Sequence, residues 1–324
     1  MNERHAAGTV ILIAIVTAAV ATAADGYPDR PVKLVVPFAP GGTTDIIARI
    51  VSQKMQPNFG QPMIVENRAG AGGVIGATDT AKALPDGYNL GVATVSTIAT
   101  APAMEPNVPY DPVSDFTPII NIAATPNVLT VNPQFPARDF QGFIAELKKN
   151  PGKYSYASPG TGSITHMQME LFKLKTGVSM VHVPYKGAGP ALNDEVAGHV
   201  LVMLDNLPSS LPYIQQGRLI PIVVAAEKRV APLPNVPTLA EVGVPEVNRM
   251  AFYGIYGPKG LPRDVVTKVH DAVKKTLDDP EVRDRIEQTG SIVIANTPTE
   301  FAQQIKSEYE TYKKLAVEQK LKPE

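Results

Sequence analysis

The stretch Val35-Val36-Pro37-Phe38-Ala39-Pro40-Gly41-Gly42-Thr43-Thr44-Asp45 decides the fold class of this chain. Its apolar first residues are typical of a strand that is covered on both faces of a parallel sheet. Gly41 and Gly42 allow a tight turn and leave backbone N–H groups uncovered by side chains. Either of the two threonines that follow can cap a helix that starts there. A strand, a glycine turn and a helix start in this order indicate an α/β unit whose turn can bind an anion.

The same alternation of strand, loop and helix continues along the chain. It favours an α/β fold of two domains, each a mostly parallel sheet flanked by helices, with a ligand cleft between them. Strands are predicted at residues 32–36, 61–66, 88–94, 116–120, 128–131, 154–157, 180–183, 200–204, 220–226, 252–256 and 291–295. Helices are predicted at residues 45–55, 74–83, 140–149, 164–175, 191–198, 209–216, 262–277 and 280–289, with a last helix capped by 297–300 that runs to about 318.

The limits of the two domains follow from where the chain crosses between them. We expect the first domain to comprise residues 24–123 and 248–324. The second domain should comprise residues 124–247, including a proline-rich return connection at about 230–247.

The first 23 residues predict a secretory signal peptide. An almost wholly apolar run at 10–20 precedes Ala21-Thr22-Ala23, which has the small-x-small pattern of a cleavage site. We therefore expect cleavage near Ala23 and export of the mature chain. A retained membrane anchor is the alternative, because the residues before the apolar run are only weakly positive.

Composition excludes several classes of function. The chain has no cysteine, so it has no disulfide, no thiolate metal site and no cysteine nucleophile. Its formal net charge is −1, which gives no sign of nucleic-acid binding or of a membrane-surface patch. The histidines show no metal-ligand spacing. We expect a monomer that binds no nucleic acid, no metal and no cofactor.

A second loop, Ser158-Pro159-Gly160-Thr161-Gly162-Ser163, has the same character as the first. It follows a predicted strand and precedes a predicted helix, so its amides and hydroxyls should also lie at the carboxyl end of a sheet. A single loop of this kind is more often an ordinary capped helix start. Two of them, one in each predicted domain, favour a shared binding cleft.

Candidate ligand-binding residues lie on these two loops and at neighbouring strand ends. For Asp205, binding a ligand and capping the next helix are equally consistent with the sequence. His166 is more typical of a packing or capping residue than of a base, and Lys186 of a residue in an exposed turn. The candidates are Phe38, Pro40, Gly41, Gly42, Thr43, Thr44, Asp45, Ser96, Thr97, Ser158, Gly160, Thr161, Gly162, Ser163, His166, Tyr185, Ala188 and Asp205.

Motifs of common enzymes are missing from the sequence. There is no G-x-S-x-G, S-x-x-K or Walker A motif. The run Gly70-Ala71-Gly72-Gly73-Val74-Ile75-Gly76 is not G-x-G-x-x-G, and residues 88–104 contain no acidic residue for a ribose. One enzyme hypothesis stays open, a secreted hydrolase or transferase that uses Ser158 or Ser163 as the nucleophile and His166 as the base. Its weakness is that no third group is visible to orient the imidazole.

Several segments together resemble one family, the extracytoplasmic (Bug-type) solute receptors of tripartite tricarboxylate transporters. They occur in the family's order along nearly the whole mature chain. The segments are 30–45, 66–73, 85–88, 158–163, 182–187 and 233–243.

The resemblance implies a periplasmic receptor with a two-domain Venus-flytrap fold and a membrane transporter as its partner. It implies that backbone amides and hydroxyls of the loops 38–45 and 158–163 hold a carboxylate, partly through ordered water. The family's tyrosine after the next strand matches Tyr185, and its acidic residue at a strand end matches Asp205. Family ligands include dicarboxylates, citrate, aromatic acids and acidic amino acids.

The leading hypothesis is a non-catalytic receptor that captures a small organic carboxylate and delivers it to such a transporter. A sensor-coupled receptor with the same fold is an alternative. A bulky residue in place of Gly42 is expected to abolish carboxylate binding without unfolding the chain.

Overall fold

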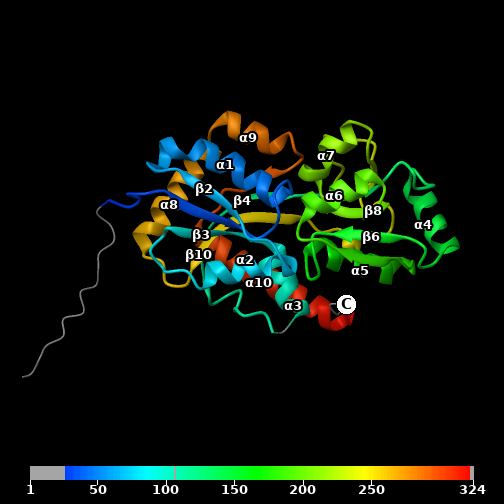
Figure 1. Ribbon diagram of the computed structural model, residues 1–324, viewed down its shortest axis with the longest axis horizontal. Helices are drawn as coiled ribbons and strands as arrows, with labels where there is room; N and C mark the ends of the chain where they lie inside the picture. The colour runs from blue at the N-terminus through cyan, green and yellow to red at the C-terminus, as the bar shows by residue number, and fades with distance from the viewer. Residues whose placement is uncertain (1–25, 106, 322–324) are drawn as a thin grey trace, which may run out of the picture.

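The computed structural model describes residues 26–105 and 107–321, and the predicted signal peptide lies outside these residues. Two sheets lie side by side with helices on both faces of each (Figure 1). We call each sheet with its helices a lobe. The first sheet has the strand order β11-β4-β10-β3-β1-β2 and the second has the order β7-β6-β8-β5-β9.

The strands of the first lobe come from both ends of the described chain. They are β1 (Val32–Val36), β2 (Met63–Asn67), β3 (Asn89–Thr94), β4 (Phe116–Thr125), β10 (Ala251–Pro258) and β11 (Ile292–Val293). The second lobe takes its strands from the middle of the chain. They are β5 (Asn127–Val131), β6 (Ser155–Ser158), β7 (Val181–Pro184), β8 (Val202–Asn206) and β9 (Ile220–Ala225).

Each sheet contains both parallel and antiparallel pairs, and most strands in each run in one direction, as expected: β10 and β11 are reversed in the first sheet and β5 in the second. β1 pairs in parallel with β2 and β3, and β6 pairs in parallel with β7 and β8. The remaining pairings, of β10 with β3 and β4, β11 with β4, and β5 with β8 and β9, are antiparallel. β4 leads the chain out of the first lobe and β10 brings it back. Because β4 runs toward the second lobe and β10 runs back from it, these two neighbouring strands are antiparallel.

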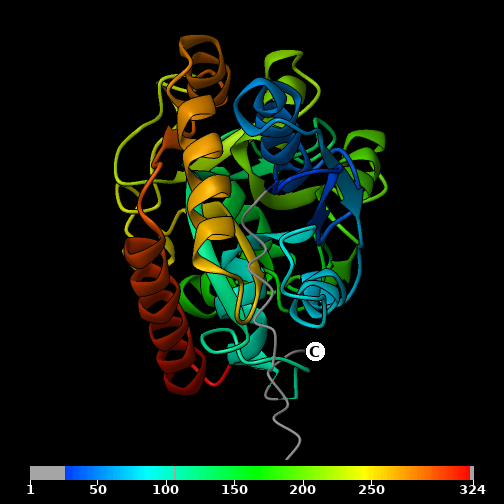
Figure 2. The ribbon, with the colours of Figure 1, turned by 90° about the vertical axis from the view of Figure 1, so that its left-hand side faces the viewer.

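Helices cover both faces of each sheet. In the first lobe they are α1 (Thr43–Phe59), α2 (Val74–Ala81), α3 (Ala101–Met104), α8 (Arg263–Leu277), α9 (Pro280–Glu287) and α10 (Pro298–Glu318). Figure 2 shows α8 in orange and α10 in red on the outer side of this lobe. In the second lobe they are α4 (Phe140–Lys149), α5 (Ile164–Thr176), α6 (Ala188–Ala197) and α7 (Leu207–Gln215). Short helical turns are η1 (Ala71–Gly73), η2 (Ser96–Thr100) and η3 (Pro245–Val247).

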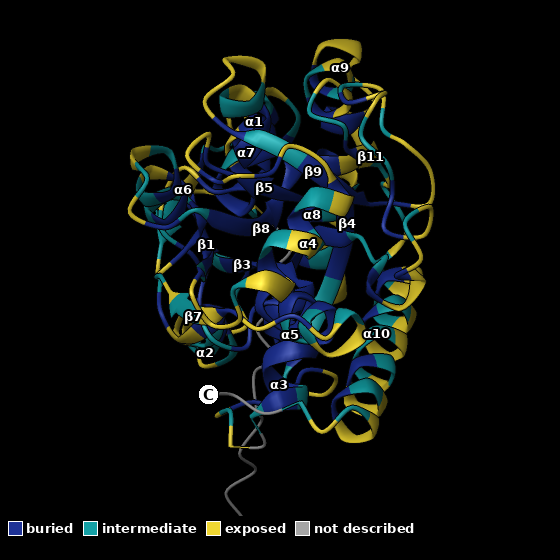
Figure 3. Ribbon diagram, turned by 90° about the vertical axis from the view of Figure 1, so that its right-hand side faces the viewer, coloured by how far each residue is buried: buried dark blue, intermediate teal, exposed yellow. Residues whose placement is uncertain are grey.

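Each lobe has its own apolar core. The central strands and the inner faces of the helices are buried, and the exposed residues lie on the outer faces of the helices, on loops and on the edge strands β2, β7 and β11 (Figure 3). The core of the first lobe contains Leu34, Phe59, Ile120 and Phe301, and that of the second contains Phe135. The predicted domain limits remain a prediction, although the division of strands between the sheets is compatible with them.

Most predicted elements lie within a few residues of the observed ones. α6 is an exception, because it begins at Ala188 and not at residue 191. Pro190 suggested a loop, but proline is tolerated in the first turn of a helix, where its missing N–H costs no hydrogen bond. The turn η2 after the third strand was not predicted. The capping box of Thr297 and Glu300 is present as expected.

No helix within residues 26–105 and 107–321 has the length and hydrophobicity that crossing a membrane requires.

Candidate functional site

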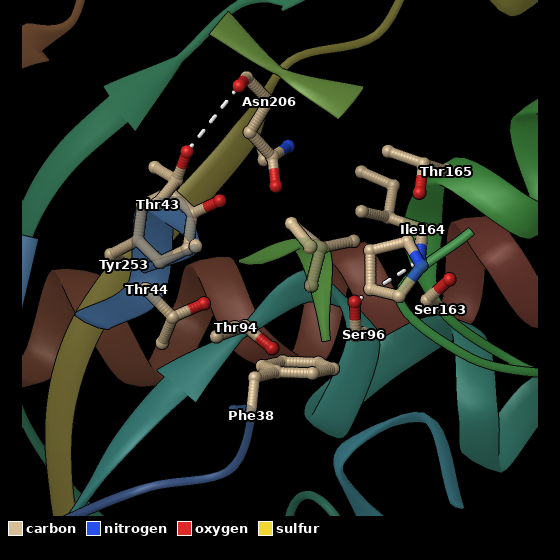
Figure 4. A pocket seen from close by; sticks show the side chains of 15 residues that line it. Phe38, Thr43, Thr44, Thr94, Ser96, Ser163, Ile164, Thr165, Asn206 and Tyr253 are labelled. Carbon is tan, nitrogen blue, oxygen red and sulfur yellow. Dashed lines mark hydrogen bonds between the residues drawn. The ribbon is translucent and has the colours of Figure 1, made fainter. Parts of the chain in front are cut away.

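A cavity lies between the two lobes, where the carboxyl ends of β1, β3, β6 and β8 face each other. The cavity is narrow in this form of the protein, because the space open to the centre of a water-sized sphere is about 20 Å³. In Figure 4, Phe38, Thr43, Thr44 and Tyr253 lie on one side and Ser163, Ile164 and Thr165 on the other. The lining contains no charged side chain. It consists of Phe38, Gly42, Thr43, Thr44, Thr94, Val95, Ser96, Pro159, Ser163, Ile164, Thr165, Ala188, Asn206, Ala251 and Tyr253.

Four helices begin at this cavity. The first residues or N-caps of α1, α5, α6 and α7 are among the lining residues. α1 starts after Gly42 and α6 after Gly187, and neither N-cap provides a side-chain hydrogen bond to its helix. The first-turn N–H groups of a helix have no partner inside the helix, and they carry a partial positive charge. The cavity therefore suits an anion although it has no basic side chain.

The starts of α5 and α7 are partly occupied by protein groups. Ser163 caps α5 by accepting a hydrogen bond from the backbone N–H of His166, at 3.3 Å. The N–H of Ile164 donates to Ser96 Oγ, at 3.0 Å. In α7 the N–H of Ser209 donates to Thr43 Oγ1, at 3.1 Å. The helix starts with the most free capacity for a ligand are therefore those of α1 and α6.

Thr165 offers the cavity a buried hydroxyl. Its side chain is 1% exposed, and among the described residues Oγ1 has no hydrogen-bond partner. A buried hydroxyl without a partner costs stability, so such a group is unusual unless a ligand or a water satisfies it. Thr165 lies in the first turn of α5, beside the predicted second loop. We infer that its hydroxyl is a ligand donor.

Replacing Thr165 with valine should weaken ligand binding without weakening the fold. Valine keeps the shape and removes the unpaired hydroxyl, so the free energy of unfolding should stay equal or rise by up to about 1 kcal/mol. Loss of a hydrogen bond to a charged ligand should lower affinity roughly tenfold. Titration calorimetry and urea unfolding check the two effects. The matched control is Thr176→Val on the same helix, whose hydroxyl donates to Phe172 O, at 2.7 Å. Equal loss of affinity in both variants would contradict the assignment.

Tyr253 supplies an aromatic wall from the return strand β10. Its side chain is 2% exposed. Burial, together with the nearby carboxyl of Asp205, raises the pKa of Tyr253 well above 10, and this outweighs the lowering effect of the Thr44 hydroxyl. The phenol therefore stays protonated and neutral at physiological pH. With Phe38 it gives the cavity two aromatic rings.

The lobes touch each other around the cavity, so the structure is a closed form. Thr100 Oγ1 donates to Gly162 O, at 2.7 Å, and the N–H of Ala39 donates to Lys186 O, at 3.0 Å. Glycines allow the backbones to approach: a Cβ at Gly189 would lie 2.1 Å from Pro40 O. A Cβ at Gly72 would likewise lie 2.1 Å from Thr161 O, and one at Gly160 would lie 3.0 Å from Gly72 N. Gly41 and Gly189 make an ordinary contact between the lobes.

Gly42 lies in the same contact between lobes. A Cβ there would be 3.2 Å from Ala188 Cβ, so a larger side chain would collide with the start of α6. The expectation that a bulky residue at this position blocks binding stays a prediction with a steric basis.

Seven of the predicted site residues line the cavity. They are Phe38, Gly42, Thr43, Thr44, Ser96, Ser163 and Ala188. The other candidates lie close by but do not line it. Pro40, Gly41, Gly160, Thr161 and Gly162 form the contacts between lobes through their backbones. Thr97 Oγ1 is hydrogen-bonded to Thr94.

Asp45 stabilises the first loop and does not face the cavity. Arg49 donates to both carboxylate oxygens, and Asn67 and the N–H of Gly41 donate as well. Burial alone would raise the pKa of Asp45, but these hydrogen bonds and the Arg49 charge hold it below its usual value. The ionised carboxylate thus fixes the turn that precedes α1.

Tyr185 and Asp205 are also engaged by protein groups. The Tyr185 hydroxyl donates to Asp194 Oδ2, at 2.6 Å. Burial and this hydrogen bond raise the pKa of Tyr185 to about 12. Asp205 Oδ2 accepts hydrogen bonds from Ser209 and Ser210 of α7. Neither side chain lines the cavity.

Ser163 and His166 do not form a nucleophile–base pair. Their hydrogen bond joins the serine hydroxyl to the backbone N–H of His166, and His166 Nδ1 accepts from the N–H of Gly162, at 3.2 Å. The His166 ring stacks on His182, with ring centroids 4.0 Å apart, and burial first of all lowers its pKa to about 4. Ser158 Oγ is hydrogen-bonded to His182 Nε2, at 2.6 Å. These contacts stabilise the conformation of the second loop.

Eight lining residues were not predicted from the sequence. They are Thr94, Val95, Pro159, Ile164, Thr165, Asn206, Ala251 and Tyr253. Asn206 directly follows Asp205, so the strand-end argument could have included it. No sequence pattern marked Tyr253 as a site residue. It lies at the cavity because the chain returns to the first lobe in β10, and this route is not evident from local sequence.

Asn206 is held by a buried network of amides that leads to the crossing between lobes. Its Nδ2 donates to Asn127 Oδ1, and Asn127 Nδ2 donates to Gln168 Oε1, at 2.6 Å. Gln168 Nε2 donates to Val247 O, at 3.1 Å, and to Arg249 O, at 2.8 Å. The network therefore joins the cavity wall to both segments at which the chain crosses between lobes.

Replacing Gln168 with leucine should destabilise the protein. Gln168 is 2% exposed, and its loss leaves buried backbone carbonyls and Asn127 short of partners. At about 1–3 kcal/mol per unsatisfied buried group, we expect a loss of roughly 3 kcal/mol in the free energy of unfolding. Urea unfolding measures it. The control is Gln141→Leu, at an exposed position of α4. A loss below about 0.5 kcal/mol in the Gln168 variant would show that the network does not support the crossing.

No group of histidine, aspartate and glutamate side chains that could hold a metal ion occurs in the described part of the chain.

Comparison with known proteins identifies relatives along nearly the whole chain. The sequence profile described as "Tripartite tricarboxylate transporter family receptor" matches residues 47–321. A solved structure of a periplasmic transporter is 51% identical, with a TM-score of 0.90, over 91% of this chain and 99% of that one. The periplasmic binding protein BugD is 33% identical, with a TM-score of 0.89, over 92% and 100% of the two chains. MatC from Rhodopseudomonas palustris, solved with bound malate, is 35% identical, with a TM-score of 0.86, over 89% and 99%. These structures confirm the predicted two-domain binding-protein architecture.

Proposed function

The chain belongs to the receptor family of the tripartite tricarboxylate transporters, and from this premise we propose that it captures one small organic carboxylate between its lobes. The observation that carries the proposal is an uncharged cavity at which four helices begin. Helix starts stabilise an anion by up to about 2 kcal/mol each when partly buried, and N–H bonds to a charged group contribute roughly 1.5–3 kcal/mol each. After the cost of ordering is subtracted, micromolar affinity is within reach.

Within the carboxylates, a dicarboxylate of four to six carbon atoms is the proposed class. Malate bound to MatC, a 35% identical protein, supports this class. The hydroxyls of Thr44, Thr165 and Tyr253, with the Asn206 amide, offer hydrogen bonds to a second polar end of the ligand. Aromatic acids are less favoured because only Phe38 and Tyr253 bring rings into the lining.

Delivery to a membrane transporter and location in the periplasm belong to the same proposal. The family name describes a receptor of a transporter, and family members are periplasmic receptors. The predicted cleavage near Ala23 would release the chain into that compartment. The hydrolase hypothesis receives no support from the site, because Ser163 lacks a hydrogen bond to an imidazole nitrogen.

A ligand screen tests the proposal. The mature chain, residues 24–324, is unfolded in denaturant and refolded so that co-purified ligand is removed. Melting shifts are then measured with dicarboxylates, tricarboxylates, aromatic acids and acidic amino acids. At a ligand concentration of 100 times Kd we expect a stabilisation of about 2.7 kcal/mol by linkage. Neutral and cationic analogues, such as the diamide and the diamine of the best ligand, serve as controls. A folded protein that no carboxylate stabilises would refute the proposal.

A further inference from the structure

A chain of hydrogen-bonded side chains crosses between the lobes beside the cavity. Thr43, in the first turn of α1, and Ser209, in α7, bring their hydroxyl oxygens to 2.8 Å. Ser209 Oγ donates to Asp205 Oδ2, at 2.6 Å. All three residues are at most 3% exposed. We call Thr43, Ser209 and Asp205 the hydroxyl chain.

The hydroxyl chain has a direction that is set by its donors. A serine hydroxyl has one proton, and Ser209 Oγ lies 2.6 Å from Asp205 Oδ2 and 2.9 Å from Asn206 O. The shorter, charge-assisted contact with Asp205 is the stronger one, and it leaves Thr43 as the donor to Ser209 Oγ. Thr43 Oγ1 has a second, longer contact with Asn206 O, at 3.4 Å. The N–H of Ser209 in turn donates to Thr43 Oγ1, at 3.1 Å. The Thr43 hydroxyl therefore both donates a hydrogen bond to Ser209 and accepts one from it. Asp205, by accepting the Ser209 proton, determines that the Thr43 proton points toward Ser209.

We propose that Asp205 is a positioning residue which, through Ser209, fixes the hydroxyl of Thr43 and holds the two lobes closed over the ligand. Asp205 lies outside the cavity lining, so it does not contact the ligand space directly. The part of the inference that concerns ligand release rests on the proposed function. The part that concerns closure of the lobes does not depend on it.

The surroundings of Asp205 support this role. Its Oδ1 atom has no hydrogen-bond partner among the described residues, so the hydroxyls of α7 are the side-chain donors that hold it. Two other titratable groups face it, Glu195 from α6 and Tyr253 from β10. Burial raises the pKa of Glu195 well above 4.5 and that of Tyr253 well above 10, so it disfavours the charged form of both. Asp205 differs from Glu195 in having two serine hydroxyls that favour its ionised form.

Burial raises the pKa of Asp205 from 3.8 to about 6, against the lowering effect of its serine donors. The folded state thus disfavours the ionised carboxyl, and this destabilisation is absent below pH 3.8, grows up to pH 6 and is complete above it. The ionised form is nevertheless the stronger acceptor for Ser209. Asp205→Asn should therefore leave the ligand-free protein as stable as the wild type, or more stable, at pH 7.5, while it weakens closure.

The chain offers a matched pair of variants for the test. Ser209 and Ser210 are neighbours in α7, both are buried, and both donate to Asp205 Oδ2. Ser209 contacts Thr43, whereas no hydrogen bond joins Ser210 to the first lobe in the described residues. Ser209→Ala should speed ligand dissociation roughly five- to tenfold, and Ser210→Ala should change it by less than about twofold. Thr43→Val should act like Ser209→Ala, and the two together should add nothing further.

Two readouts keep closure separate from ligand binding. The first readout is the dissociation rate of the best dicarboxylate from the screen, measured by stopped flow between about pH 8 and pH 5.5. In the wild type this rate should rise as the pH falls and Asp205 is protonated, whereas in Ser209→Ala it should not change with pH. Because the chain has no cysteine, spin labels at Gln53→Cys and Gln215→Cys, two exposed sites on α1 and α7, report the distance between lobes without ligand. Wild type should contain a larger closed fraction than Ser209→Ala or Asp205→Asn. Equal closed fractions, or equal effects of Ser209→Ala and Ser210→Ala, would overturn the inference. If no carboxylate binds the wild type, the proposed function fails, and the label distances still test closure.

Discussion

Gly189→Ala should abolish ligand binding while the ligand-free protein stays folded. In the closed structure a Cβ at this position would lie 2.1 Å from the carbonyl oxygen of Pro40 in the other lobe. That contact is with backbone, so it cannot be relieved by a rotamer change, and the lobes must stay apart. Gly189 lies in the first turn of α6 and does not have a positive φ, so alanine fits its own helix and favours it by up to about 1 kcal/mol.

Affinity should fall at least a hundredfold in this variant, because ordinary overpacking already costs about 1–3 kcal/mol and this contact opposes the whole closure. Titration calorimetry measures the affinity. Small-angle scattering should show that the lobes of this variant stay apart both with and without ligand. Gly142→Ala is the control, since this glycine lies in α4 and its Cβ would meet Ala137 of the same lobe. Wild-type affinity in the Gly189 variant would mean that the ligand binds without closure.

Ser163→Asp should eliminate binding, and Ser163→Asn should largely keep it. Ser163 is 1% exposed, lines the cavity and caps α5. Aspartate and asparagine have nearly the same size, and both are good N-cap residues, so the fold should tolerate either. They differ by one negative charge facing the ligand. At 4 Å and an effective dielectric constant of about 20, two like charges repel by about 4 kcal/mol.

This pair isolates the sign of the ligand's charge. We expect the two variants to differ in affinity at least a hundredfold at pH 7.5, with similar melting temperatures. Binding that is equal in both variants, or tighter with aspartate, would show that the cavity takes a neutral or cationic solute.

The sequence predicted the parts of the site that depend on local chain geometry. The Gly41–Thr43 turn and the Ser163 cap were recognisable because a strand end, a glycine turn and a helix start carry their own residue preferences. The same argument placed Asp45 and Tyr185 in the site, and in the structure neither of them lines the cavity. Both side chains turn to a partner in their own lobe, Arg49 or Asp194, which local sequence does not reveal.

The rest of the site depends on how the lobes close, and no local pattern encodes that. Tyr253 reaches the cavity because β10 returns between β3 and β4. The pairing of Thr43 with Ser209 joins residues 166 positions apart, through two loops that each have ordinary cap residues. The strands β4 and β10 were predicted, but their antiparallel pairing was not, because the route of the chain between the lobes determines it.

A structure of the complex tests the central claim most directly. The mature chain should be crystallised with the best carboxylate from the screen. We predict the closed form, with a carboxylate oxygen within about 3 Å of first-turn N–H groups of α1, next to Gly42 and Thr43, and with Thr165 Oγ1 donating to the same ligand. A ligand that is bound outside this cavity, or held inside it without any N–H group of a helix start, would contradict the account.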